Sequence, residues 1–399
     1  MTKRWSVTFL LVLLAFPPHA RSEQPLFRLM VVQSLAATSV YGVATAINDA
    51  GLVVGHSLLA SGAVHAAAWQ NGRVTDLGTA GGRDSHAWGV NNLGAIVGSA
   101  QTSQGNTTAM LWSAGGVTAL TGLGGANSEA YGINDAGVIV GAGNPTTPPF
   151  NAPNRPIVWK DAVPSDLGTL GGDSGGALAI NAASLIAGAS RTATQPYVQG
   201  ALWDHGTIVN LSTPGQLDSA VRAINAIGMM AGLAEDLPFG GYYAARWQNN
   251  VIGRLPVPEG SMYSYANGIN DDGAIVGQMD LSFSDRAALW IGSTVWDLNS
   301  LLVADRQTRD WRLTSANDIN HVGQIVGTAY NFATGRSAAF LLTPVPEPAA
   351  ALLLLAGLVV IAARVRPGGR SSAFGHTGRA HDHRREGVRE RRAGWRRGS

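Results

Sequence analysis

The amino-acid sequence predicts an all-β protein, a seven-bladed β-propeller of four-stranded repeats about 45 residues long. Three observations lead to this fold. A nine-residue phrase occurs seven times, an aromatic residue follows each copy at a regular distance, and the strand that the last repeat lacks is present before the first phrase.

The recurring phrase reads Ile/Val-Asn-x-x-Gly/Ser-x-Ile/Val/Met-Val/Ala-Gly, and successive copies begin 43 to 50 residues apart. A period of this length is typical of a four-stranded unit. Residues such as 48–51 join two apolar stretches and tolerate a left-handed backbone, so they predict a β-hairpin turn. The seven copies are 47–55, 90–98, 133–141, 180–188, 224–232, 269–277 and 319–327.

The strands around this turn have distinct compositions. The strand before it alternates small residues, as in Ser85, Ala87, Gly89 and Asn91, which suits the crowded strand nearest a propeller axis, and the strand after it is branched and apolar. A third strand ends in a large aromatic side chain that can fill the wedge between repeats. An Asp-Leu-Gly step, as in 76–78, ends a fourth strand. The aromatic residues are Trp69, Trp112, Trp159, Trp203, Trp247, Trp290 and Phe340.

The strands are complete only if the chain closes into a ring. After Phe340 the last repeat has no room for a fourth strand, because Pro344 begins a different segment. Residues 27–35 form an additional apolar strand before the first phrase, so we expect the N-terminal strand to complete the last blade and leave no open edge. An open β-solenoid is the alternative architecture.

Charge is distributed unevenly along the 399 residues. Between residues 22 and 363 the chain has 14 basic and 23 acidic residues, a net charge of about −9, and the excess of arginine lies at the two ends. This charge argues against nucleic-acid binding by the repeat body, residues 23–343. The sequence contains no cysteine, which excludes disulfides and thiolate chemistry.

Residues 1–22 have the three parts of a secretory signal peptide: two basic residues, an apolar run over 5–16 and a short polar stretch. Cleavage after Ser22 places the small residues Ala20 and Ser22 at the positions that signal peptidase reads. An N-terminal membrane anchor or a buried strand is the alternative interpretation.

The C-terminal end has a second targeting pattern. Alternating prolines over 344–348 precede fifteen apolar residues, 349–363, which predict a short helix. At ~1.5 Å per residue this helix reaches ~22 Å, less than the ~30 Å hydrocarbon core of a bilayer. Arg364 and Arg366 mark its C-terminal side as cytoplasmic. A single-pass anchor that is never cut is the alternative, and the basic tail 367–399 is expected to be disordered.

The segment 344–366 resembles the PEP-CTERM sorting domain of Gram-negative bacteria. The resemblance rests on Val345, Pro346, Glu347 and Pro348, followed by the apolar stretch and the arginines. It implies recognition by an exosortase, a membrane transpeptidase, with cleavage near the Pro-Glu-Pro step, often in organisms that make exopolysaccharide. The family usually ends soon after its basic cluster, whereas 33 residues follow here.

The repeat body resembles the HAF repeat family of extracellular proteins. The resemblance is carried by the fuller phrase that runs from Trp159 through 166–172 to Asn181, and the His-Ala-Phe step that names the family is degenerate here, at 65–67 and 337–340. It implies an exported, repeat-built surface protein, and it brings no catalytic residues to carry over.

Two motifs suggest chemistry, and the repeat explains both. Residues 172–176 spell the sequence around the nucleophile of chymotrypsin-like proteases, but we interpret Ser174 as the repeat counterpart of Ser85 and Ser128. The Asn-Asp turns, with 271–272 the most acidic, lack the alternating ligands and terminal Glu of a calcium loop. We expect no catalytic, metal or cofactor site from these motifs, and we expect the histidines to be scattered: His56, His65, His86, His205 and His321.

Two functions fit these observations. The first is a non-enzymatic surface or matrix protein that binds a polysaccharide or a surface protein across the mouth of its channel and meets signal peptidase and exosortase during export. The alternative is a propeller lyase or hydrolase acting on extracellular glycans, which requires residues from several blades at one face. Residues that depart from the repeat in this way are Glu235, Asp236, Tyr242, Tyr243, Arg306 and Asp310.

Overall fold

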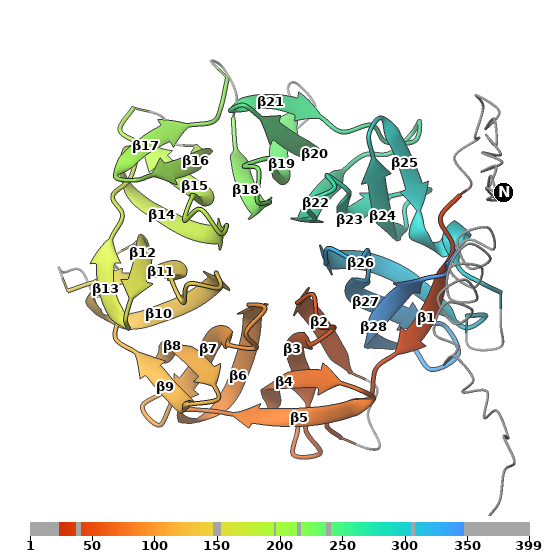
Figure 1. Ribbon diagram of the computed structural model, residues 1–399, viewed down its shortest axis with the longest axis horizontal. Helices are drawn as coiled ribbons and strands as arrows, with labels where there is room; N and C mark the ends of the chain where they lie inside the picture. Colours follow the sequence, from red (N-terminus) through yellow and green to blue (C-terminus); the bar gives the residue numbers. More distant parts are fainter. Residues whose placement is uncertain are drawn as a thin grey trace, which may run out of the picture. The chain divides into compact units, whose positions relative to one another are not determined.

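The computed structural model describes residues 24–36, 41–146, 153–194, 197–213, 217–236, 241–304 and 308–346. These residues form seven four-stranded antiparallel sheets, arranged as blades around a central axis (Figure 1). The predicted seven-bladed β-propeller is therefore confirmed, and the open solenoid is excluded. The predicted signal peptide 1–22, apolar helix 349–363 and tail 367–399 lie outside the described residues.

Each of the first six blades consists of four consecutive strands, the first of which lies nearest the axis. Blade 1 is β2 (Gly42–Ile47), β3 (Val53–Leu58), β4 (Val64–Gln70) and β5 (Arg73–Gly78). Blade 2 is β6 (Gly81–Val90), β7 (Ile96–Thr102), β8 (Thr107–Ser113) and β9 (Gly116–Leu120). Blade 3 is β10 (Gly124–Ile133), β11 (Ile139–Pro145), β12 (Arg155–Lys160) and β13 (Val163–Asp166).

The second half of the ring repeats this plan. Blade 4 is β14 (Gly171–Ile180), β15 (Ile186–Thr192), β16 (Val198–Asp204) and β17 (Thr207–Asn210). Blade 5 is β18 (Ser219–Ile224), β19 (Met230–Asp236), β20 (Gly241–Gln248) and β21 (Val251–Arg254). Blade 6 is β22 (Ser264–Ile269), β23 (Ile275–Asp280), β24 (Asp285–Ile291) and β25 (Thr294–Asp297), and blade 7 contains β26 (Trp311–Ile319), β27 (Ile325–Asn331) and β28 (Arg336–Pro344).

Blade 7 joins the two ends of the repeat body, as predicted. Its fourth and outermost strand is β1 (Phe27–Val31), which pairs with β28 from Phe27 opposite Pro344 to Val31 opposite Phe340. Beyond this ladder the backbone N–H of Val345 donates to the carbonyl oxygen of Leu26 at 2.8 Å. The first residue of the predicted sorting motif is therefore still hydrogen-bonded to the propeller.

A tryptophan on the third strand ties each of the first six blades to the preceding blade. The Nε1 of Trp159, for example, donates to the carbonyl oxygen of Thr121 at 2.7 Å, and the side chain is fully buried. Trp69 makes the same contact with Gln33, just after β1, at 2.6 Å. The predicted wedge role of these residues is confirmed. In blade 7 the residue in the tryptophan register is Leu342, opposite Ile325, whereas Phe340 lies two residues earlier, opposite Gly327, so Phe340 does not share the tryptophan position. Phe340 belongs to the same buried cluster as Leu298 and Leu301 of the 3-10 helix η1 (Leu298–Leu301).

The glycine that ends each phrase is required by a close approach of two strands. A Cβ atom at Gly98 would lie 2.0 Å from the carbonyl oxygen of His86 on the inner strand, and the distance is 1.9 to 2.1 Å in all seven blades. Because no side chain fits there, the repeat retains glycine. Among the described residues, no helix is long and apolar enough to cross a membrane.

Candidate functional site

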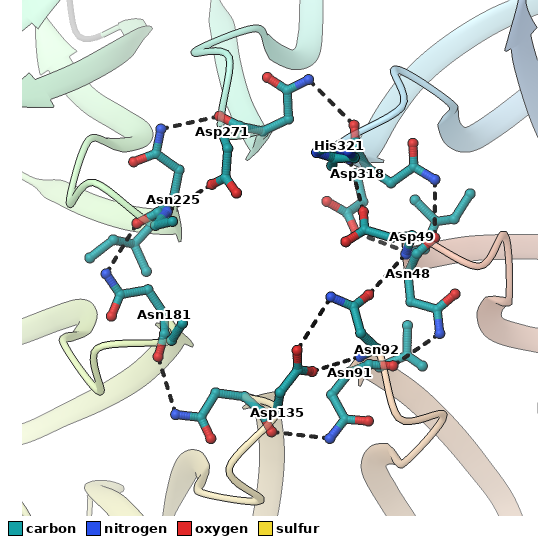
Figure 2. Close-up of a pocket in the computed structure, with 18 of the residues that line it drawn as sticks. Asn48, Asp49, Asn91, Asn92, Asp135, Asn181, Asn225, Asp271, Asp318 and His321 are labelled. Atoms are coloured by element: carbon teal, nitrogen blue, oxygen red, sulfur yellow. Dashed lines mark hydrogen bonds between the residues drawn. The ribbon is translucent and has the colours of Figure 1, made fainter.

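Seven asparagines, one from each phrase, form a closed ring around the axis (Figure 2). The Nδ2 of Asn48 donates to the carbonyl oxygen of Asn91 in the next blade at 3.0 Å, and Asn320 closes the ring by donating to the carbonyl of Asn48 at 3.0 Å. The Oδ1 of Asn48 also accepts a bond from the N–H of Leu52 at 2.9 Å, within its own turn. The other ring members repeat both bonds: Asn91, Asn134, Asn181, Asn225 and Asn270.

The predicted hairpin turns are thus confirmed, but each asparagine also holds two blades together. All seven are buried, with at most 6% of their surface exposed. A buried amide that satisfies its donors and acceptor in this way contributes to closure of the ring rather than to ligand binding.

The asparagine ring lines a cavity of about 240 Å³ on the axis. Carboxylates at its edge are engaged by backbone N–H groups: Asp135 accepts from Asn92 at 2.8 Å, and Asp49 accepts from His321 at 3.0 Å. Asp271, which we had interpreted as a turn residue, accepts from the N–H of Ala226 in the neighbouring blade at 2.8 Å. Within the described ranges, no group of three or more His, Asp or Glu residues is arranged to hold a metal ion.

Asp318 departs from the repeat at this end of the axis. Its Oδ2 accepts a bond from the N–H of Ile47 in blade 1 at 2.9 Å, and its Oδ1 accepts from Ile319 at 2.9 Å. Burial raises the pKa of this carboxyl to about 7, although the two backbone N–H groups act in the opposite direction. The six other blades have Gly or Ala at this place: Ala46, Gly89, Gly132, Ala179, Ala223 and Gly268.

Each inner strand contains a β-bulge at the residue immediately before the position that Asp318 occupies in blade 7. The register shifts between Ala87 and Gly89 in blade 2, which leaves Trp88 as the additional residue, and the corresponding shift occurs in every blade. A bulge bends the strand and redirects a side chain. The seven bulge residues differ widely in chemistry: Thr45, Trp88, Tyr131, Leu178, Arg222, Asn267 and Asn317.

The bulge residues and the residues two positions before them lie on the strands nearest the axis and keep part of their surface exposed. Some reach the next blade: Thr45 Oγ1 donates to the carbonyl of Ala87 at 2.8 Å, and Asn317 Nδ2 donates to that of Ala44 at 2.7 Å. The larger ones form two clusters, one in blades 1 to 3 and the other in blades 5 and 6.

The first cluster combines imidazoles, an indole and a phenol. The rings of His86 and Trp88 are stacked, with centroids 5.5 Å apart, and His56 meets His86 edge to face at 4.7 Å. Burial lowers the pKa of His56 to about 4 and also lowers the pKa of His86, so both are neutral at pH 7. Tyr131 donates to Glu129 at 2.6 Å. The expectation that the histidines are scattered is therefore wrong for His56 and His86.

The second cluster contains three tyrosines and an arginine. The ring of Tyr265 lies 6.2 Å from that of Tyr242 and 5.6 Å from that of Tyr263, measured between centroids. The guanidinium of Arg222 lies 5.4 Å from the centroid of Tyr265, and its Nη1 donates to Asn267 Oδ1 at 2.6 Å. Burial by the surrounding protein lowers the pKa of Arg222.

Acidic residues hold the tyrosine hydroxyls. Tyr263 donates to Asp285, and this hydrogen bond raises its pKa to about 12, while Tyr242 donates to Asp218 at 3.5 Å. This cluster has the Tyr and Arg composition that dominates binding energy at many interfaces.

The structure brings together only part of the set that sequence reasoning selected. Tyr242 belongs to the second cluster, and Glu235 is close enough to contribute to the raised pKa of its phenol, after burial and Asp218. Tyr243 packs in the core with the guanidinium of Arg254 4.9 Å from its ring. Asp310 is exposed on blade 7, far along the chain from the other candidates. Arg306 and the side chain of Asp236 lie outside what the structure describes.

Ser174 occupies a different repeat position from the one expected. Ser85 pairs with Ala100 and Ser128 with Gly143, whereas the residue in that register in blade 4 is Gly175, opposite Ser190. The correspondence was therefore wrong by one residue. In the described part of the chain no hydrogen bond joins Ser174 to a histidine, so the protease-like sequence has no partner base.

Sequence reasoning missed most of the two clusters, although a signal was present. Six of the missed residues occupy the third or fifth position before the asparagine, between the small residues of the inner strand. A large or charged residue at either position departs from the repeat. These residues are His86, Trp88, Glu129, Tyr131, Arg222 and Tyr265.

Among the predicted targeting residues, Val345 and Pro346 are described, and Val345 is bonded to Leu26 as above. The others lie outside the described residues: Ala20, Ser22, Glu347, Pro348, Arg364 and Arg366.

The fold and its axial clusters define a repeat protein of the β-propeller class. No protein-family model and no curated protein matches the chain. Solved structures match it in fold. One is the β-propeller domain of the Trilobed protease from Pyrococcus furiosus, which has an open velcro topology; it shares 8% identity with a TM-score of 0.52, over 76% of this chain and 93% of that domain.

Two further matches are more distant. TolB from Acinetobacter baumannii has 10% identity and a TM-score of 0.40, over 74% of this chain and 64% of TolB. The Aleuria aurantia lectin, solved as a mutant with a fucosylated disaccharide, has 10% identity and a TM-score of 0.37, over 64% of this chain and 94% of the lectin. At these identities the likeness concerns the fold alone.

Proposed function

We propose that this protein is an exported bacterial surface or extracellular-matrix protein whose propeller binds an extracellular glycan through the side chains that face its axis. The observation that carries the proposal is the row of seven bulges. The seven bulge positions do not share one residue type, and Trp88, Tyr131 and Arg222 are the large aromatic or charged residues among them.

Ring closure does not account for these three residues. The asparagines, the phrase glycines and the wedge tryptophans join the blades, and they occur in nearly every repeat. The regular strand pairing does not require large aromatic or charged side chains at these partly exposed inner positions. Aromatic faces suit the C–H faces of sugar rings, and Arg, Glu and Tyr groups suit their hydroxyls.

Export is supported by the signal-peptide pattern over 1–22 and by the PEP-CTERM resemblance over 344–366. The position of Val345 is compatible with cleavage at the next residues, because the chain leaves the last ladder there. In this proposal signal peptidase and exosortase process the chain, and the mature propeller remains at the cell surface or in the matrix as a binding protein without catalytic activity.

Binding is tested with the purified protein and the exopolysaccharide of the producing bacterium. Trp88→Ala and Tyr265→Ala should each weaken retention on the immobilised polymer by about tenfold, as expected for interface aromatics. Trp296→Ala is the control, because this tryptophan is also half-buried but lies on β25, the outermost strand of blade 6. Equal loss in all three variants would contradict an axial site, and shortening of the polymer by the protein alone would favour the enzyme.

A further inference from the structure

Arg222 is the only Lys or Arg at the fourteen inner-strand positions that form the bulges or lie two residues before them. Its side chain is exposed to solvent near the axis, yet surrounding protein lowers the pKa of its guanidinium because fewer water molecules can solvate the charge. An accompanying anion contributes more where the hydration of a cation is reduced in this way.

Three other arginines of the propeller lie beside a carboxylate. Arg155 pairs with Asp166 at 3.0 Å, and Arg83 and Arg191 lie near aspartates at 3.9 and 4.0 Å. Within the described ranges, no carboxylate oxygen lies within 4.0 Å of the guanidinium of Arg222. Its contacts there are neutral, namely the amide oxygen of Asn267 and the ring of Tyr265.

These contacts hold the guanidinium in place, but they leave most of its hydrogen-bond donors unused. Guanidinium has five N–H donors, and a single hydrogen bond, from Nη1 to Asn267 at 2.6 Å, is made to the protein. The planar group is thus held at one edge, and the residue remains exposed to solvent. This arrangement suits a bidentate bond to a carboxylate.

We propose that Arg222 binds the carboxylate of an acidic sugar unit while the tyrosine cluster of Tyr242, Tyr263 and Tyr265 packs against the sugar ring. The inference rests on the proposed glycan binding and specifies its ligand class. The rings of Tyr242 and Tyr263 each lie beside that of Tyr265, and the guanidinium of Arg222 lies over the ring of Tyr265.

The surrounding charge selects among acidic ligands. Asp218 and Glu235 act on the phenol of Tyr242, and Asp285 binds that of Tyr263, so negative charge flanks the single arginine. The repeat body as a whole carries about −8. Densely charged polyanions such as nucleic acids are repelled by this field. The ligand is therefore a heteropolysaccharide whose uronate units are separated by neutral sugars.

The test uses an array of alternating uronate-containing oligosaccharides, hyaluronan fragments included, each printed beside its carboxyl-reduced and therefore neutral form. The parent protein should bind the acidic member of at least one pair about tenfold more tightly than the reduced member, because one charge-assisted pair is lost on reduction. Arg222→Gln should bring the two affinities within about twofold, and Arg222→Lys should keep part of the preference, since it keeps the charge but not the fork. Unchanged melting temperatures establish that the variants are folded.

The outcomes separate this inference from the proposed function. If reduced forms bind as tightly as acidic ones and Trp88→Ala abolishes that binding, glycan binding stands and the role of Arg222 is wrong. A preference for acidic forms that persists in Arg222→Gln also overturns the inference. If neither member of any pair binds, both the acidic-sugar inference and the glycan-binding function are wrong.

Discussion

Asp318 makes the stability of the propeller depend on pH in a direction unusual for an aspartate. Burial raises the pKa of its carboxyl from 3.8 to about 7 in the folded protein. Between these two values the folded chain keeps a proton that the unfolded chain has released. The free energy of unfolding therefore decreases as the pH rises from about 4 to about 7, and the loss is complete above 7.

The size of the effect follows from the shift. Each pH unit in this window corresponds to about 1.4 kcal/mol, so the difference between pH 5 and pH 8 is about 3 kcal/mol. Asp318→Asn removes the titrating group. Its amide oxygen can accept only one of the bonds from Ile47 and Ile319, so a constant loss of stability is expected at every pH. The prediction concerns the slope of the free energy of unfolding against pH, which this constant loss does not change.

Urea unfolding followed by tryptophan fluorescence at pH 5, 6, 7 and 8 measures this slope. The parent should lose about 3 kcal/mol relative to Asp318→Asn across the series, with equal m-values. Asn317→Ala is the matched control, because it removes the 2.7 Å bond to Ala44 at the same seam without removing an ionisable group, and its curve should run parallel to that of the parent. Parallel curves for the parent and Asp318→Asn would refute the reasoning.

Other features give predictions of their own. Asn134→Ala should lower the free energy of unfolding by about 2 to 4 kcal/mol, because it leaves the N–H of Val138 without its partner and removes the bond to the carbonyl of Asn181 in the next blade; in the same urea assay, Asn106→Ala in an exposed turn should change it by less than about 0.5 kcal/mol. Gly98→Ala should abolish soluble, cooperatively unfolding protein, since its Cβ would lie 2.0 Å from a backbone oxygen, and a normal unfolding curve would contradict the close approach. Glu347→Ala combined with Pro348→Ala should leave uncut protein in the inner membrane, as judged by fractionation and mass spectrometry; surface release at the parental mass would show that the sorting interpretation is wrong.

The architecture could be predicted because each of its determinants repeats. Trp159 and five other tryptophans recur at one position of the unit, and the residues around Phe27 supply the strand that is missing after Phe340. The recurrence of these residues reveals the repeat unit. The number of strands reveals the closed ring, because the strand missing from the last blade is found at the start of the chain.

Contacts between units leave no comparable trace in the sequence. The asparagine ring was missed because a local turn already explains Asn48, and its second bond reaches a residue 43 positions away. The stack of His56, His86 and Trp88 joins residues of two repeats at three different repeat positions. Ser174 was assigned by its residue type, although it lies six residues before Ile180 whereas Ser85 lies five before Val90, and both this count and the pairing register select Gly175.

The bulges separate the residues that close the ring from the residues that can determine what the propeller binds. Each bulge residue lies between an alanine or valine that packs in the blade and a position where the repeat has Gly, Ala or Asp318, so its side chain is not part of the regular strand pairing. The bulge residue can therefore change without altering the backbone pairing of its blade, although Thr45, Asn267 and Asn317 also donate side-chain bonds to a backbone carbonyl of the next blade. A library randomised at Trp88, Tyr131, Leu178 and Arg222 would vary the chemistry around the axis while the asparagines and glycines keep the ring closed, and the fold offers these positions as independent sites for engineering new binding specificities.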